Sequence, residues 1–176
     1  MPSSIAHASV AILLSPVLGT RVVSRRLVAV AAVAAAVPDL DAIGRPFGRG
    51  DIAFLGGHRA TTHSLLFALC VALAAAIASR RATTSGTRLL IACYVALVVA
   101  SHGFLDALAT YGEGVAFFAP LSAQRWKFGW QPFSGLLPEI LALWFPAAVV
   151  FVLWLKPRLN PAPIATRDTD AAVHLR

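Results

Sequence analysis

Apolar residues fall along the chain in long blocks that polar connections separate. Residues 1–20, 60–79, 89–105 and 140–155 contain no Asp, Glu, Lys or Arg. A helix needs roughly 20 mainly apolar residues to cross about 30 Å of hydrocarbon, and Ala, Leu and Val, which favour helices and close helix packing, dominate these blocks. The pattern therefore predicts an all-α integral membrane bundle of about five helices, near residues 4–20, 26–38, 63–79, 88–109 and 136–155.

The ends of this predicted bundle differ in character. No basic segment precedes the first apolar run, so we expect a retained helix rather than a cleaved secretory signal. The second helix has only 12 uncharged residues, from Leu27 to Pro38; it either begins among the preceding arginines or lies buried between its neighbours. Residues 1–156 form one membrane-embedded domain, and the polar residues 157–176 are expected to be a disordered cytoplasmic tail.

Composition and charge support a membrane protein. The chain is 58% hydrophobic and 13% charged, with a mean hydropathy of +0.74, which excludes an ordinary soluble domain. A net charge of +7 would suggest nucleic acid in a soluble protein. Here ten Lys and Arg lie after the first, third and fifth helices and five in the other connections. The positive-inside rule then predicts an outside N-terminus, a cytoplasmic C-terminus and membrane lipids, not nucleic acid, as partners.

The two cysteines lie inside apolar blocks. In the predicted topology the depths of Cys70 and Cys93 differ by roughly 10 Å, whereas a disulfide needs its Cα atoms within about 7 Å. We therefore expect two packed free thiols.

Polar residues that survive within the apolar chain form four small clusters. Ionisable groups at membrane depth are costly and by default indicate function. The clusters lie at the start of the first and third helices and at the end of the second and fourth, so alternating helix direction brings them to one end of the bundle, opposite the arginine-rich loops. This end is predicted to be extracytoplasmic, and its members are His7, Asp39, Asp41, His58, His63, His102 and Asp106.

These side chains have the chemistry of a metal site. His102 and Asp106, four residues apart, share a helical face. Imidazole with carboxylate suits zinc, manganese or iron, and the absence of cysteine from the clusters argues against a closed thiolate zinc site. We predict one or two divalent ions, zinc first, with all seven residues as ligands and Asp39 or Asp41 as ligand or general base. Arg59, Arg125 and Lys127 either hold a phosphate oxygen or contact lipid head groups.

These motifs also resemble a known family. PDLD, HRATTHS and SHGFLDALATYG, preceded by an N-terminal His and followed by FFAPLS, resemble the YdjM-like family of bacterial inner-membrane proteins, described as metal-dependent hydrolases, over about residues 1–155. That family is remotely similar to zinc-dependent phospholipase C and P1 nuclease, whose helical His-x-x-x-Asp matches His102 and Asp106. The body has no histidine after Asp106, so the resemblance implies one or two ions rather than three zincs.

The combined prediction is a multi-pass inner-membrane enzyme that cleaves a phosphate ester of a lipid or lipid-linked substrate with metal-activated water. The rival classes are an ion or proton carrier and a protein that keeps a metal for structure only. A carrier needs polar groups through the whole membrane depth, and the inner halves of the first, third and fourth helices are almost entirely apolar.

Plainer interpretations remain for each cluster. His7 suits an interfacial position, and Asp39 and Asp41 suit the end of a helix. Thr61 or Thr62 could cap the third helix and leave His58 and Arg59 in solvent. A structural hydrogen bond would explain His102 and Asp106.

Overall fold

The computed structural model describes residues 2–19, 23–43 and 56–159. Every regular element in these ranges is helical, so the predicted all-α fold is confirmed. Arg45, Arg49 and the predicted tail from residue 160 onward lie outside the described residues. The last helix continues through Pro157 to Leu159, three residues past the predicted boundary of the membrane domain.

The first two helices each end in a tighter 3₁₀ turn. α1 (Ser4–Leu14) continues into η1 (Ser15–Leu18), and α2 (Arg25–Ala36) continues into η2 (Val37–Ala42). A proline is the second residue of both 3₁₀ segments; it has no N–H for the regular helical bond, so each α-helix stops just before it. The PDLD motif therefore lies in η2 and not in the second α-helix.

The third and fourth predicted helices begin at polar caps. The short η5 (Thr61–His63) precedes α3 (Leu65–Ser79), and α4 runs over Ser85–Ala107. The hydroxyls of Ser64 and Thr84 accept a hydrogen bond from the third residue of α3 and of α4, which satisfies one of the unpaired N–H groups at a helix start. Ser64, rather than Thr61 or Thr62, is thus the cap of the third helix.

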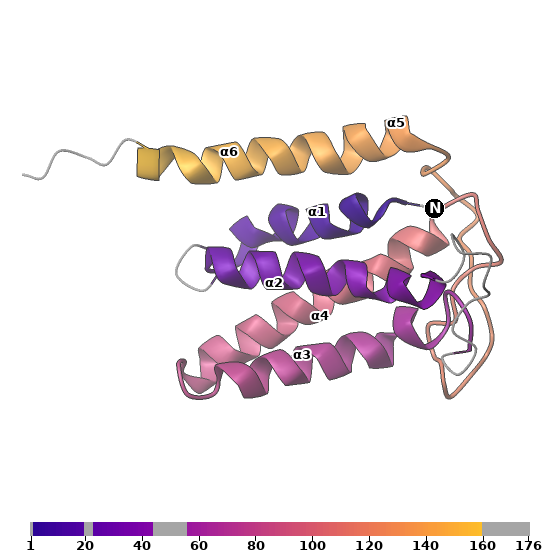
Figure 1. Ribbon diagram of the computed structural model, residues 1–176, viewed down its shortest axis with the longest axis horizontal. Coiled ribbons are helices and arrows are strands. Elements are labelled where there is room, and N and C mark those ends of the chain that lie inside the picture. The colour runs from indigo at the N-terminus through magenta and orange to yellow at the C-terminus, as the bar shows by residue number, and fades with distance from the viewer. Residues whose placement is uncertain (1, 20–22, 44–55, 160–176) are drawn as a thin grey trace, which may run out of the picture.

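The last predicted helix is one continuous rod with a change of winding. α5 (Leu136–Glu139), the π-helical η6 (Ile140–Trp144) and α6 (Phe145–Leu159) follow one another without a break. Pro146 is the second residue of α6 and cannot donate to the preceding turn, and a π-turn is one way for a helix to accommodate such a loss. Figure 1 shows this rod beside α1, on the outside of the four other helices.

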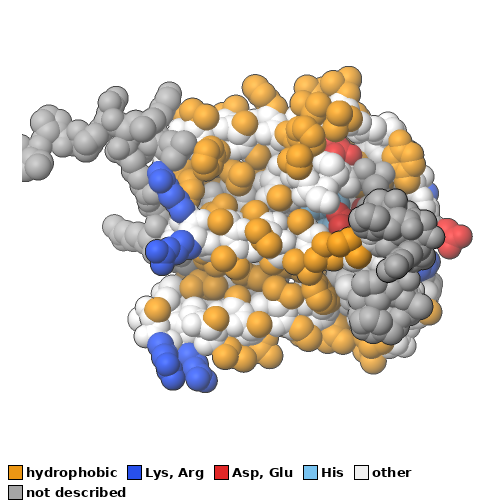
Figure 2. Space-filling view, viewed as in Figure 1, with side chains coloured by type: hydrophobic (Ala, Val, Ile, Leu, Met, Phe, Trp, Pro, Cys, Tyr) orange, Lys and Arg blue, Asp and Glu red, His pale blue; other side chains and the backbone are white. Residues whose placement is uncertain are grey.

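Two of these helices are long and apolar enough to cross a membrane. They are α4, with 23 residues, and the 19 residues of Leu136–Trp154. The helices at Ser4–Val17 and Leu65–Ser79 are apolar but shorter, and α2 has 12 residues, as predicted for the second helix. Apolar side chains cover much of the visible bundle surface (Figure 2), a pattern that suits contact with lipid.

Small residues fill the space between the helices. The main core packs α1, α2, α3 and α4 around fully or nearly fully buried alanines and valines, among them Ala11, Ala31, Ala35, Ala68, Ala72 and Val98. Alanine lets helix backbones approach closely, which is how helices associate where lipid removes the hydrophobic driving force. Tyr94 adds a buried polar link, since its hydroxyl donates to the Ala11 carbonyl over 2.6 Å.

The cysteines face outward. Cys70 and Cys93 are free, as predicted, but both are exposed on the bundle surface. The expectation of packed thiols was wrong because the core selects alanine and valine, and thiols are small enough for a lipid-facing surface as well.

Candidate metal centre

The seven predicted ligands meet at one end of the bundle. His7 comes from α1, Asp39 and Asp41 from η2, and His102 and Asp106 from α4; His63 ends η5 and His58 precedes it. The seven form three overlapping groups in which the possible ligand atoms lie within 4.8 Å of one another. Figure 1 places these elements at the same end, beside the loop that follows α4.

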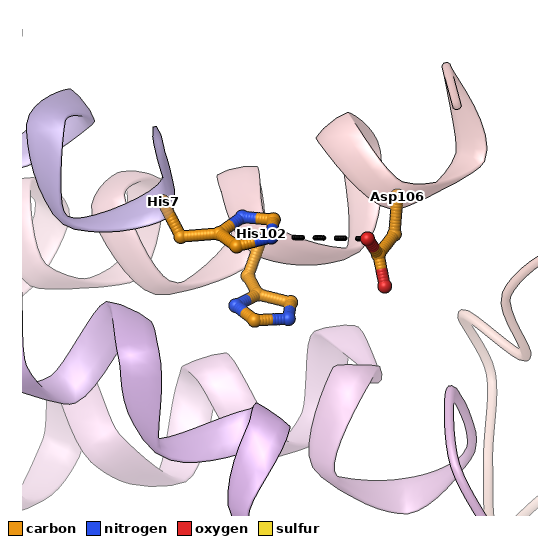
Figure 3. A group of neighbouring side chains, drawn as sticks. All are labelled: His7, His102 and Asp106. Atoms are coloured by element: carbon orange, nitrogen blue, oxygen red, sulfur yellow. Dashed lines mark ion pairs between the residues drawn. The ribbon is translucent and has the colours of Figure 1, made fainter. Parts of the chain in front are cut away.

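His7, His102 and Asp106 lie at the centre of this cluster, and all three are completely buried. The two imidazole rings stack with centroids 3.6 Å apart, and Nε2 of His7 lies 3.7 Å from Oδ1 of Asp106 (Figure 3). His102 and Asp106 share one face of α4, as the spacing of four residues predicts. Burial at this depth excludes the interfacial position that His7 alone could have had.

The hydrogen bond of His102 assigns its ring nitrogens. Its Nδ1 lies 2.6 Å from the carbonyl oxygen of Ala35, and a carbonyl only accepts. Nδ1 therefore carries the hydrogen, and in the neutral ring Nε2 presents a lone pair.

His63 has the same tautomer for a different reason. The Thr62 hydroxyl lies 2.6 Å from Oδ2 of Asp41 and 3.0 Å from Nδ1 of His63. An ionised carboxylate only accepts, so the hydroxyl donates to Asp41 and its lone pair accepts from Nδ1–H of His63. The lone pair of neutral His63 is then on Nε2.

The two lone pairs face each other. Nε2 of His63 lies 3.0 Å from Nε2 of His102, and two acceptors at this distance repel unless a cation lies with them. The cation is either a proton, shared as an N–H···N bond, or a metal ion. Nearby carboxylates surround the pair: Oδ1 of Asp39 is 3.4 Å from Nε2 of His102, and Oδ2 of Asp106 is 3.4 Å from Nε2 of His63.

Unpartnered acceptors at the same place fit a metal ion. Within the described residues, both ring nitrogens of His7, both carboxylate oxygens of Asp106 and Oδ1 of Asp39 are buried without a hydrogen-bond partner. Buried polar atoms are nearly always paired, and leaving one unpaired costs about 1–3 kcal/mol. Nitrogen and carboxylate donors that converge in this way are the ligands that zinc and related transition metals take.

Asp39 is the most accessible of these carboxylates. Its side chain is 14% exposed, whereas those of Asp41 and Asp106 are fully buried. Oδ2 of Asp39 accepts a hydrogen bond from Ser4. Burial raises its pKa, but the nearby ring of His102 and the bond from Ser4 outweigh burial and lower the pKa of Asp39 to about 2. Asp39 is therefore ionised at neutral pH, which favours a metal ligand over a general base.

Asp41 has its oxygens already occupied. Oδ1 lies 2.6 Å from Nδ1 of His58, and Oδ2 accepts from Thr62 and lies 3.4 Å from Nδ1 of His63. Burial opposes ionisation, but these contacts outweigh it and hold the pKa of Asp41 well below its usual range. A carboxylate behind an imidazole fixes the ring of a ligating histidine, so the geometry suits Asp41 to orienting His63.

The basic residues predicted near the site divide into two kinds. Arg59 is buried and its Nε lies 3.0 Å from Oδ2 of Asp106. Arg125 donates to the carbonyls of His58 and Gly114, and the exposed Lys127 donates to those of Thr110 and Gly112. The latter two cations thus hold the loop after α4, whereas Arg59 lies against the cluster.

Several plainer interpretations are excluded by burial. His58 and Arg59 are 7% and 3% exposed, so they are not solvated residues before a capping threonine. Asp39 and Asp41 do lie just beyond the end of α2, but the contacts that the described residues make with them come from histidines, Ser4 and Thr62.

Sequence reasoning did not find Thr62 or Glu139. The sequence favours Thr62 as a possible cap, although its place between His58 and His63 was an available signal. Glu139 is buried and accepts from the amide and the hydroxyl of Ser3, over 2.9 and 2.8 Å. It ties the start of α1, and with it His7, to α5. A lone acid at the start of an apolar helix was its only signal.

Comparison with known proteins confirms the predicted family resemblance. The YdjM inner membrane protein family matches residues 1–165. The inner membrane protein YbcI of Escherichia coli (strain K12) is 32% identical over 179 residues, which cover 90% of this chain and 100% of YbcI. No solved structure matches, so the remote similarity to phospholipase C stays a prediction. With two helices long enough to span a bilayer and a His/Asp cluster able to hold a metal ion, the chain is a membrane protein that belongs to the YdjM inner membrane protein family.

Proposed function

We propose that this protein is a membrane-bound metal-dependent hydrolase with its site on the extracytoplasmic face of a bacterial inner membrane. The observation that carries the proposal is the pair of Nε2 atoms of His63 and His102, 3.0 Å apart. Beside them lie carboxylate oxygens of Asp39 and Asp106 that have no hydrogen-bond partner within the described residues. His7 completes a set of five donors. A zinc, manganese or iron ion held by these residues would polarise an ester and lower the pKa of a water molecule towards about 7.

The chain's own residues prepare the site for this chemistry. The carbonyl of Ala35 fixes the ring of His102, and Thr62 with Asp41 fixes that of His63. Such supporting hydrogen bonds set the orientation and basicity of ligating imidazoles. Asp39, on the partly exposed side, is placed to accept a hydrogen bond from an incoming water and to orient it.

The charge distribution supports the proposed sidedness. In the described part of the chain, Arg25, Arg26, Arg80, Arg81 and Arg88 lie at the start of α2 and around the connection from α3 to α4, opposite the histidines. Figure 2 shows Lys and Arg gathered at that end of the visible face and Asp, Glu and His toward the other. The positive-inside rule places the arginine end in the cytoplasm. Because α1 to α4 alternate in direction along the chain, we propose that the protein crosses the membrane several times. From its location in the membrane we propose a lipid or lipid-linked substrate.

A proton carrier is the second candidate, and one observation favours it. Burial lowers the pKa of His63, but its contacts with Asp106 and Asp41 outweigh burial and raise that pKa above the ordinary value, so a proton can take the place of the metal. A carrier needs a polar path across the membrane, whereas the described cluster ends at Ala35 and His102, and the core beyond them is apolar.

The test is hydrolysis by the purified protein in detergent with zinc, manganese or iron. Chromogenic phosphate monoesters, phosphate diesters and carboxylic esters are compared, using wild type, His102→Ala and the charge control Arg88→Gln on the opposite end of α4. We expect metal-dependent turnover that His102→Ala abolishes and Arg88→Gln retains. Metal-loaded wild type without turnover of any ester, together with proton flux in liposomes that His63→Ala abolishes, would favour the carrier instead.

A further inference from the structure

Arg59 is a buried cation with free donors at the edge of the metal centre. Arg59 is 3% exposed, and its Nε lies 3.0 Å from Oδ2 of Asp106. The two groups are close but misaligned, because among the described residues neither Nε nor Nη2 of Arg59, nor either oxygen of Asp106, has a hydrogen-bond partner. An aligned guanidinium and carboxylate would share two parallel hydrogen bonds. Nε and Nη2 of Arg59 can therefore donate hydrogen bonds to a third group, such as a ligand.

The backbone around Arg59 is built to hold it in this place. Arg59 has φ 64°, a left-handed conformation that residues with a side chain rarely adopt. Its carbonyl accepts from the amide of Ala116 over 2.9 Å, and Nη1 donates to the carbonyl of Tyr111. Gly112 lies against the guanidinium with φ 78°, a conformation that favours glycine, and a Cβ there would force Nη1 of Arg59 to shift. Strained residues that several contacts hold in place concentrate at functional sites.

The contacts of Arg59 favour an anionic ligand. The carboxylates of Asp39, Asp41 and Asp106 together balance the charges of one divalent ion and of Arg59. The carboxylate that faces Arg59, that of Asp106, is also a proposed metal ligand, and an oxygen that binds an ion is a poorer acceptor for the guanidinium. Buried donors without a hydrogen-bond partner are disfavoured, so an anion that binds beside the ion would stabilise Arg59.

The form of the donors narrows the class of anion. A guanidinium fork matches the oxygens of a phosphate or a carboxylate, and such charge-assisted bonds are about twice as strong as neutral ones. A carboxylic ester offers only an uncharged carbonyl, whereas a phosphate ester has several anionic oxygens that can contact Arg59 and the metal together. Arg125 and Lys127 already donate to backbone carbonyls, which leaves Arg59 as the residue fitted to this task among the three predicted.

We infer that Arg59 binds the anionic oxygens of a phosphoryl group held at the metal centre. This inference rests on the metal-dependent hydrolase proposed above, and it makes the substrate a phosphate ester. The guanidinium holds the phosphoryl group beside Asp106 and selects it over an uncharged ester. Lipid phosphates and soluble phosphates share this group, and the experiment below distinguishes the two.

The experiment measures phosphate binding to detergent-purified protein loaded with Mn²⁺. Broadening of the ³¹P signal of inorganic phosphate by the bound ion gives the Kd, and elemental mass spectrometry gives the metal content of each sample. The variants are Arg59→Gln, Arg59→Lys and Arg88→Gln. Arg88→Gln is an equal loss of charge on a half-buried side chain at the far end of α4. Glycerol 3-phosphate and dihexanoyl phosphatidic acid, as soluble and lipid probes, are titrated in parallel.

We expect Arg59→Gln to keep its metal and to bind phosphate at least about tenfold more weakly, as the loss of a charged hydrogen bond predicts. Arg59→Lys should be intermediate, and Arg88→Gln should match wild type. Tighter binding of the phosphatidic acid identifies a lipid source, and equal or tighter binding of glycerol 3-phosphate a soluble one; either result supports the assignment of Arg59.

Two results would overturn the inference in different ways. Equal phosphate affinity in wild type and Arg59→Gln, both with metal, would remove Arg59 from binding and leave the proposed hydrolase intact. Loss of metal from both Arg59→Gln and Arg59→Lys would assign Arg59 to holding Asp106. Wild type that takes up no metal would instead refute the proposed function on which the inference rests.

Discussion

At the scale of single residues, the position of two hydrogens decides the chemistry of the site. Ala35 and Thr62 each hold the hydrogen of a histidine on Nδ1, so the lone pairs of His63 and His102 face one another across 3.0 Å. The same geometry takes a proton or a metal ion. This competition, rather than the number of acids and histidines, gives the site its expected dependence on pH.

The first prediction concerns that competition. The contacts of His63 with Asp106 and Asp41 raise its pKa above the ordinary value of about 6.5, so the ring keeps a proton up to and beyond this pH. A metal ion displaces the proton, and its apparent affinity should rise as pH increases from 6 to 8 and fall as pH decreases. Competition titration of Zn²⁺ against a chelator at each pH measures it. An affinity independent of pH would contradict the assignment of His63 as a ligand.

A second prediction separates orientation from ligation. Asp41→Asn keeps the shape of the side chain but removes the charge that Thr62 and His63 face. Because the partner of a ligating histidine sets its orientation, we expect about 10- to 100-fold weaker metal affinity with unchanged stoichiometry at saturating metal. Chelator competition gives the affinity and elemental mass spectrometry the stoichiometry. If saturating metal restores one ion fewer than in wild type, Asp41 is itself a ligand.

The site residues that the sequence predicted are clustered ionisable side chains in or beside apolar blocks, whereas Thr62 and Glu139 lack such a signal. A histidine or aspartate in an apolar block stands out because burial of its charge is costly. Thr62 is ordinary in any turn, and Glu139 is ordinary at the start of a helix, so neither stands out. Their roles depend on partners 21 and 136 residues away, at Asp41 and Ser3, which no local pattern contains.

At the scale of elements, the site requires α4 to lie very close to η5. Gly103, one residue after His102, faces the backbone of His63: a Cβ there would come within 2.6 Å of the His63 carbonyl oxygen. The absence of a side chain thus lets the two ligands His63 and His102 meet.

Substitution of this glycine gives a third prediction. Gly103→Ala should push η5 from α4, destabilise the protein by about 1–3 kcal/mol as overpacking does, and weaken metal binding. Gly86→Ala is the matched control on the same helix, with nothing within 4 Å of its added Cβ; helix propensity favours it by up to about 1 kcal/mol. Thermal unfolding measures the change in stability, and chelator competition measures the change in metal affinity. Equal Tm and affinity in the two variants would contradict this packing.

Helix existence was predictable where hydrophobicity alone decides it. The apolar blocks correctly placed all five helices, and the ends shifted where local chemistry intervenes: prolines turned the ends of the first two into 3₁₀ segments, and Ser64 rather than an earlier residue began α3. The π-turn before Pro146 and the outward position of Cys70 depend on packing and could not be read from composition.

At the scale of the whole molecule, the chemistry and the positive charges occupy opposite ends of the bundle. The histidines and their carboxylates lie at one end, and Arg80, Arg81 and Arg88 surround the connection between α3 and α4 at the other. By the positive-inside rule, this asymmetry predicts that the arginine end of the bundle faces the cytoplasm.

A fourth prediction tests the orientation. Ala123→Cys, at an exposed position at the site end, and Ser85→Cys, at the start of α4, are made singly in a background with Cys70 and Cys93 changed to serine. A membrane-impermeant maleimide should label Ala123→Cys in spheroplasts and Ser85→Cys only in inverted vesicles. The reverse pattern would place the site in the cytoplasm.

If the buried histidines and carboxylates at one end of this bundle hold a metal ion, the purified protein should contain it. Elemental mass spectrometry gives the metal content of detergent-purified wild type, a His102→Ala/Asp106→Ala double variant and Gly86→Ala as a folded control. We expect one or two equivalents of zinc, manganese or iron in wild type and Gly86→Ala, and loss of that metal from the folded double variant. Well-folded wild type that stays free of these metals after reconstitution would contradict it.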